Sequence, residues 1–179
     1  MANLKEIRIR IGSVSSTMQI TSAMKMVSAA KLKKAQDAIT AMRPYSNKLS
    51  ELMQSFSGAS AGGNKSYTEN RTLNKVLVVV ISSNRGLCGA FNANIAKEAL
   101  VFKSKEKFRD SQIDFLTIGK KINDTLSKTE TIIQNDSDVF EELNYENVGK
   151  IADELMDRFV SNDYDHIEII YNSFKNAAT

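Results

Sequence analysis

Apolar residues recur at alternating intervals of three and four over the first fifty-odd positions. A first ladder consists of Leu4, Ile7, Ile11, Val14 and Met18, and a second consists of Ala35, Ala38, Met42, Tyr45, Leu49, Leu52 and Phe56. This heptad spacing is typical of a helix that packs along its length against another helix. It predicts one long helix over residues 1–57, with a coiled-coil seam formed by Leu4, Ile7, Ile11, Val14, Met18, Ala35, Met42, Leu49 and Phe56.

The seam requires a partner, because a lone helix of this kind would keep its apolar stripe in water. The rest of the chain offers no second heptad segment of comparable length. Pro44 lies within the second ladder and removes one backbone hydrogen bond. We expect a kink there and no helix end, because the ladder continues through Tyr45 and Leu49.

Beyond the predicted helix the pattern changes twice. Residues 58–73 include a Gly/Ser/Asn-rich stretch and are predicted to form a flexible linker. In residues 74–179, β-branched or alternating runs at 75–82, 113–119, 129–135 and 166–172 predict strands, and periodic segments at 92–108, 120–128 and 147–162 predict helices. Alternating strands and helices favour an α/β class, with a Rossmann-like domain and a mostly parallel sheet of about four strands.

The loop "SSNRGLCGAF" joins the first strand to a helix, which is where doubly wound folds bind ligands. Its two glycines fit neither the dinucleotide fingerprint nor the phosphate-loop pattern. We therefore interpret Arg85, Gly86 and Gly89 as a fold-setting turn, with Arg85 available for a partner.

Residues capable of catalysis or metal binding are sparse. Cys88 is the single cysteine, which excludes an internal disulfide and a multi-thiolate metal site within one chain. His166 is the single histidine, and we take this to exclude a triad or a multi-histidine metal site within one chain. Cys88 is expected to be a small buried apolar residue, and the acidic run Asp136, Asp138, Glu141 and Glu142 a solvated loop without metal-loop spacing. The sequence predicts no catalytic residue, no cofactor and no metal.

Charge separates the two parts of the chain. The net charge of +3 divides into +6 over residues 1–57 and −3 over the remainder, which indicates an acidic partner for the first segment. Basic coiled-coil proteins that bind nucleic acid carry a dense basic block, whereas here lysine alternates with methionine. This mixture favours a protein partner with an apolar socket and an acidic rim. The residues expected to contact it are Met24, Lys25, Met26, Lys31, Lys33 and Lys34. We expect neither nucleic-acid binding nor insertion into a membrane, since no apolar run has the length of a span.

Three blocks resemble the gamma subunit of F-type ATP synthase, the central rotor shaft. They are "LKEIRIRIGSVSSTMQITSAMKMVSAAKLKKAQ", "RPYSNKL" and "VVVISSNRGLCGAFNANI", and the similarity runs in order from the amino terminus to the last predicted strand. The resemblance implies a non-catalytic subunit that couples proton flow to ATP synthesis. It implies as partners the alpha, beta and epsilon subunits and the membrane c-subunit ring, and a peripheral location on the cytoplasmic face of a bacterial inner membrane.

By position, the resemblance places Met24, Lys25 and Met26 against an acidic loop of the catalytic subunits. Lys31, Lys33 and Lys34 would extend this basic collar, and the helix near Pro44 would lie towards the membrane.

The family continues beyond the position of Thr179 with a carboxy-terminal helix that completes the coiled coil. We therefore expect this chain to be an amino-terminal fragment. In isolation its seam is expected to pair with another copy, fold back or be partly disordered. The alternative interpretation is a homodimeric coiled-coil adaptor whose α/β domain binds a small ligand.

Overall fold

The computed structural model describes residues 3–59, 67 and 71–175, without the side chains of 56–59. The chain divides into two compact units, Met1–Gly63 and Asn64–Thr179. Most of the linker predicted at 58–73 lies outside the described residues. Each unit is considered by itself below.

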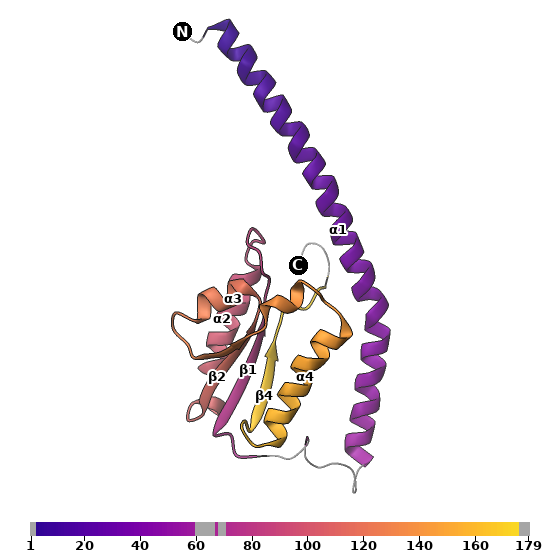
Figure 1. Ribbon diagram of the computed structural model, residues 1–179, viewed down its shortest axis with the longest axis vertical. Coiled ribbons are helices and arrows are strands. Elements are labelled where there is room, and N and C mark those ends of the chain that lie inside the picture. The colour runs from indigo at the N-terminus through magenta and orange to yellow at the C-terminus, as the bar shows by residue number, and fades with distance from the viewer. Residues whose placement is uncertain (1–2, 60–66, 68–70, 176–179) are drawn as a thin grey trace. The chain divides into compact units, whose positions relative to one another are not determined.

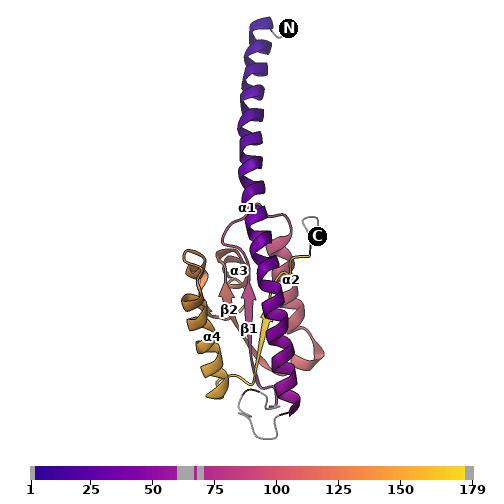
Figure 2. The ribbon, with the colours of Figure 1, turned by 90° about the vertical axis from the view of Figure 1, so that its right-hand side faces the viewer.

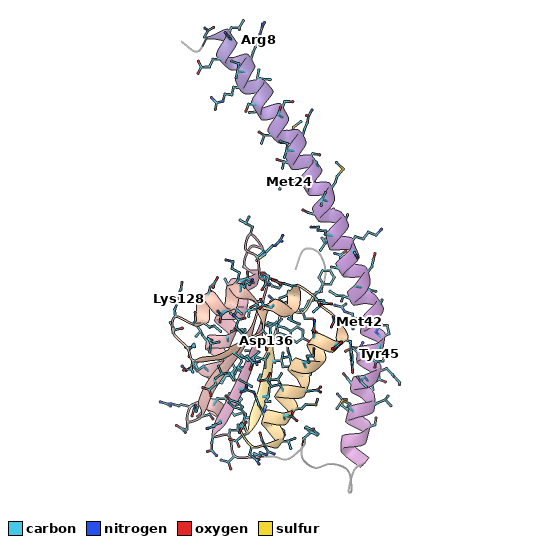
Figure 3. The ribbon with its side chains drawn as sticks, in the orientation of Figure 1. Arg8, Met24, Met42, Tyr45, Lys128 and Asp136 are labelled. Carbon is cyan, nitrogen blue, oxygen red and sulfur yellow. The ribbon has the colours of Figure 1, made fainter. Side chains whose placement is uncertain are left out.

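The first unit is one helix, α1, Leu4–Ala59, and the prediction of a single long helix is confirmed (Figure 1). At 1.5 Å per residue, its 56 residues extend over about 80 Å. Asn3 caps the start, because its carbonyl accepts from Glu6 N at 2.8 Å and its side chain accepts from Lys5 N at 3.3 Å. Pro44 stands inside α1, and the ribbon continues past Met42 and Tyr45 without ending (Figure 3). The helix therefore continues through the proline, as the sequence predicted, and the kink expected at Pro44 stays a prediction.

The second unit is built on a sheet of four parallel strands. They are β1, Lys75–Ile81; β2, Gln112–Ile118; β3, Ile132–Asn135; and β4, His166–Ile170, in the order β3-β2-β1-β4. The helices are α2, Phe91–Lys103; α3, Lys120–Leu126; and α4, Tyr145–Val160, with the 3-10 turns η2, Glu106–Phe108, and η3, Ser137–Phe140. This architecture confirms the predicted α/β class and sheet.

Two boundaries differ from the predictions. The segment predicted as a helix over 92–108 divides into α2 and η2, because Lys105 between them has an extended backbone. The strand predicted from residue 129 begins only at Ile132. The amide groups of Thr129 and Glu130 both donate to Leu126 O, so these two residues close α3 and do not extend β3.

Successive residues of β1 supply two separate cores. Val76, Val78 and Val80 face α2 and α3, whereas Leu77 and Val79 face the side that α4 covers. Figure 2 shows α4 on one face of the sheet and α2 on the other. A strand buried on both faces reads as a continuous apolar run, which is why "VLVVVI" could be recognised in the sequence.

Tyr164 connects the strand β2 to the segment before β4. Its hydroxyl donates to the Asp114 carboxylate at 3.0 Å, and its side chain is buried. Burial, together with the hydrogen bond to Asp114 and the negative charge there, raises the pKa of Tyr164 to about 12. The folded unit therefore holds this proton more tightly than the unfolded chain does.

We expect folding stability to fall as pH rises between about 10 and 12, because the unfolded tyrosine, with a pKa of about 10, loses its proton first. Tyr164→Phe should flatten this decline. In an absorbance titration of tyrosine ionisation it should also remove the step near pH 12. Tyr145→Phe is the matched control, since Tyr145 is almost fully exposed. A step near pH 12 that persists in Tyr164→Phe would contradict the assignment.

Within the described residues, none of the helices combines the length and apolar character that crossing a membrane demands.

Candidate partner-binding surfaces

The methionine and lysine residues predicted to contact a protein partner lie in the middle of α1, and all are exposed. Met24 and Met26 are 65% and 66% exposed, and Lys25, Lys31, Lys33 and Lys34 are exposed as well. Met24 and Met26 are two residues apart, so they project in directions roughly 200° apart on an α-helix. The six residues therefore form a collar around the helix and do not share one face. A single flat partner cannot contact all of them.

The two apolar ladders also lie on different sides of α1. Met18 and Met42 are 68% and 66% exposed, and the 24 residues between them correspond to about 6.7 turns, which places them roughly 120° apart. Because seven residues fall about 20° short of two turns, a heptad seam winds around the helix in the left-handed sense. A helix that covered both ladders would have to wind around α1, as in a coiled coil. For Phe56, the last predicted seam position, the side chain lies outside the description.

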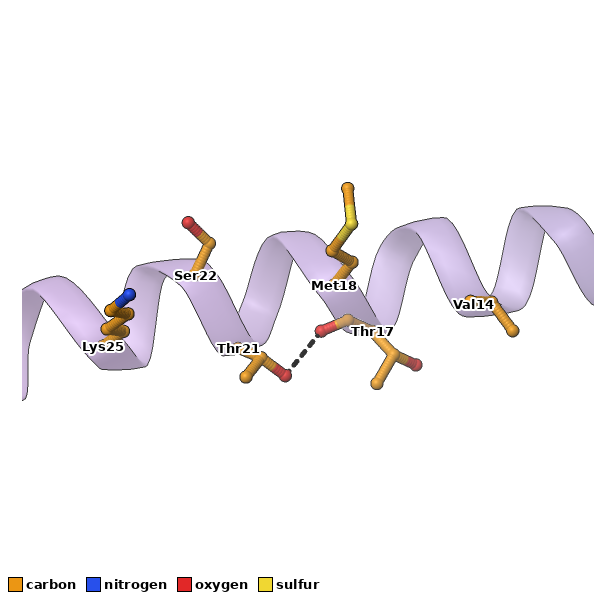
Figure 4. A pocket seen from close by; sticks show the side chains of 6 residues that line it. All are labelled: Val14, Thr17, Met18, Thr21, Ser22 and Lys25. Atoms are coloured by element: carbon orange, nitrogen blue, oxygen red, sulfur yellow. Dashed lines mark hydrogen bonds between the residues drawn. The ribbon is translucent and has the colours of Figure 1, made fainter.

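One face near the amino-terminal end of α1 carries a shallow groove (Figure 4). Val14, Thr17, Met18, Thr21, Ser22 and Lys25 line it. The hydroxyl of Thr21 donates to Thr17 O at 2.8 Å, and that of Thr17 donates to Ser13 O at 2.9 Å. Because these two hydroxyls are satisfied within the helix, this face can meet another surface without leaving them unpaired. Short side chains beside Met18 also permit close approach.

The predicted fold-setting turn lies in the loop between β1 and α2. Gly89 has a backbone φ of +59°, which favours glycine. At Gly86 an added Cβ would come no closer than 3.9 Å to Lys121, so the structure shows no steric need for glycine there. The loop is held by side chains: Ser83 Oγ donates to Arg85 O at 2.6 Å, and Ser83 N donates to Asn92 Oδ1 at 3.2 Å.

The carboxyl ends of β1 and β2, where a nucleotide crevice would be expected, are tied together by direct contacts. Asn84 accepts from Lys120 N at 2.9 Å and donates to Ser137 O at 3.0 Å. Ser82 Oγ accepts from Ile122 N at 3.1 Å. Gly119 has a φ of +125°, and a Cβ there would lie 2.6 Å from Ser82 O. These loops are built to pack on each other, which favours the structural interpretation of this end of the sheet.

Sequence reasoning missed several features of this region. Leu87, the fully exposed tip of the loop, has a positive φ of 60°, and no local pattern marked it. The expected burial of Cys88 was wrong: the thiol is exposed and receives a hydrogen bond from Asn92 Nδ2 at 3.2 Å. The spacing of Ser83, Cys88 and Asn92 could have indicated that these side chains meet across the loop.

Acidic and thiol groups are dispersed in the described part of the chain. No group of three or more His, Cys, Asp or Glu side chains there has the arrangement of a metal site. Glu154 is instead part of a polar cluster: it accepts from Gln134 Nε2 at 2.9 Å and from Arg158 Nη2 at 2.7 Å. These hydrogen bonds lower the pKa of Glu154. The cluster joins α4 to β3 and has no feature of a catalytic acid.

Comparisons with known proteins place the chain in a protein family. A family model described as ATP synthase matches residues 3–179. The chain is 63% identical to the ATP synthase gamma chain of Flavobacterium psychrophilum and 59% identical to that of Flavobacterium johnsoniae. It is 41% identical to the ATP synthase gamma chain of Geobacter sp. strain M21. Each alignment covers 100% of this chain and 62% of the relative. The chain thus spans less than two thirds of the length of these relatives.

Proposed function

This chain belongs to the ATP synthase gamma-chain family, and we propose that it acts as part of the central-stalk shaft of an F-type ATP synthase. In this role it couples proton flow through the membrane sector mechanically to ATP synthesis and hydrolysis in the ring of alpha and beta subunits. It contributes no catalytic residue. Its partners are the alpha, beta and epsilon subunits and the c-subunit ring, and its place is peripheral, on the cytoplasmic face of a bacterial inner membrane.

The observation that carries this proposal is the arrangement of α1. Its exposed methionines and lysines surround the helix, and its apolar seam follows a path that winds around it. A helix that is partly covered by a second helix, and that turns inside a ring of protein subunits, needs these two kinds of surface at once. Methionine suits a contact with partners of changing shape, because its side chain is flexible and polarizable.

An asymmetric shaft can drive conformational change without chemistry of its own. A bound partner shifts the open–closed equilibrium of a catalytic subunit only if it binds the two states differently. In α1, the face with Met24 and the face with Met26 present different neighbours, so each catalytic subunit would meet a different surface as the shaft turns. The collar of Lys25, Lys31, Lys33 and Lys34 would face acidic groups on those subunits.

Reconstitution tests the proposal. The chain, extended to the full length of its relatives, is mixed with alpha and beta subunits, and the complex is analysed by size-exclusion chromatography with ATPase measurement. We expect a stable assembly with one copy of this protein per alpha/beta ring. If the chain is instead a homodimeric adaptor, it should form a dimer that does not bind the alpha and beta subunits. No observation on the described residues favours that alternative.

A further inference from the structure

The second unit carries an apolar hollow that the shaft role of α1 does not explain. It has a volume of about 310 Å³ and lies between α4, η3 and the carboxyl-end part of the sheet. Ile81 and Ile118 form part of its floor on the sheet, and Val139 and Ile151 form walls on η3 and α4. Every one of its lining residues is apolar. A hollow of this size lies within the range of binding pockets in proteins.

The rim of the hollow is exposed in this unit. Leu143 is 67% exposed, Ile169 is 51% exposed and Val148 is 45% exposed, and all three line the hollow. Together they make a contiguous apolar surface on three segments: the loop after η3, the strand β4 and the helix α4. Contiguous apolar surface of this kind marks binding sites more often than surface without function.

Acidic groups flank the hollow on one side. Residues 136–146 contain five Asp or Glu and no Lys or Arg. A second, polar hollow of about 300 Å³ shares Val139 and Ile151 with the apolar one, and Asp136 and Asp138 line it. Its lysine, Lys150, lies 3.3 Å from Glu146, so that positive charge is already paired within the molecule. The apolar hollow therefore lies beside a polar hollow whose side chains carry a net negative charge.

We propose that this composite surface binds a basic amphipathic helix of a partner polypeptide. Apolar side chains at helical spacing would enter the hollow lined by Leu143, Ile151 and Ile169, and lysine or arginine side chains would lie over Asp136 and Asp138. Amphipathic helices are commonly recognised in this way, by an apolar groove with a charged border. The acidic neighbour determines the choice of partner, because it would repel an acidic helix or a nucleic acid.

The test uses the 179-residue chain and two synthetic helical peptides that carry leucine at the same helical spacing. One peptide has lysine and the other glutamate at the remaining positions. In an NMR titration of the isotope-labelled chain, we expect the lysine peptide to shift the amide signals of Val139, Leu143, Ile151 and Ile169. Fluorescence anisotropy with the same peptide should give a saturable curve that weakens as salt is raised.

Two substitutions make the result specific. Leu143→Lys places a charge on the rim at an exposed position, and we expect affinity for the lysine peptide to fall by about tenfold. Leu100→Lys is the matched control: Leu100 is 43% exposed on α2, on the opposite face of the sheet, and this variant should bind as the parent does. A well-dispersed spectrum of each variant verifies that the fold is retained.

Several outcomes would overturn the inference. Equal binding of the glutamate peptide would show that the acidic neighbour has no role, and shifts restricted to α1 would place the contact elsewhere. Unchanged affinity of Leu143→Lys for the lysine peptide would likewise place the contact elsewhere. If sedimentation shows that the chain is a dimer and that the lysine peptide dissociates it, the surface would be assigned to self-association. Because α1 takes no part in the predicted contact, failure here would leave the proposed shaft function standing.

Discussion

Reversing Lys31, Lys33 and Lys34 to Glu should weaken assembly with the alpha and beta subunits by about 100-fold, on the basis of roughly 1 kcal/mol for each reversed charge. The three lysines are exposed on α1, so the substitution changes the charge of the collar without disturbing a buried contact. Like charges brought together across an interface are unfavourable, and an acidic partner would then meet an acidic helix. The loss should diminish as salt is raised, because exposed charges are screened. The measurement is the affinity of the full-length protein for the alpha/beta ring at two ionic strengths.

A matched control separates position from total charge. Lys97, Lys120 and Lys128 are exposed in the second unit, and their reversal to Glu changes the net charge of the chain by the same amount. We expect the control to assemble nearly as the parent does, and both variants to retain the thermal stability of the α/β unit. If the collar variant assembles and couples as well as the control, the collar is not the contact.

Replacing Gly119 with alanine should destabilise the second unit by about 3 kcal/mol. The backbone φ of +125° is strained for any residue with a side chain, and the new Cβ would lie 2.6 Å from the carbonyl oxygen of Ser82. Ser82 cannot withdraw easily, because its amide donates to Ile118 O at 2.8 Å and its Oγ accepts from Ile122 N. The loops at the carboxyl ends of β1 and β2 would be forced apart.

Gly149→Ala, in the same unit, should have the opposite effect on stability. Gly149 lies inside α4 and has no atom within 4 Å of its hypothetical Cβ, so alanine there should stabilise α4 by about 1 kcal/mol. Native-state hydrogen exchange of the β1 amides measures both effects without interference from α1, since these amides report on the opening of the sheet. Slowed or unchanged exchange in Gly119→Ala would contradict the close contact between the two loops.

The predictions from the sequence that were confirmed rest on local periodicity. The heptad ladders predicted α1, and the apolar run of β1 predicted a strand buried on both faces, because each pattern depends only on neighbours a short distance along the chain. Gly119 was missed because its importance comes from a contact between loops that follow different strands. Leu87 was missed because no local pattern marks its positive φ. Cys88 was misjudged because its exposure depends on how the loop from β1 to α2 projects.

The candidate collar was identified by residue type, and its arrangement around α1 needed helical geometry as well. Met24 and Met26 are only two residues apart in the sequence, yet a helix directs them to nearly opposite sides. Their roles as contacts, like those of the seam and of Arg85, are still predictions. The apolar hollow beside α4 could not have been foreseen, because its lining comes from five separate elements and one connecting loop.

The most direct measurement of the central claim is a reversible covalent link between α1 and a catalytic subunit. In full-length protein carrying Cys88→Ser, Lys25→Cys would be paired with a cysteine placed in the catalytic-subunit loop that is proposed to face the collar. If α1 is a shaft that turns within the ring, oxidation should stop ATP hydrolysis in proportion to the cross-linked fraction, and reduction should restore it. Full hydrolysis with the link intact, or no link between these two positions, would show that α1 is not the turning shaft.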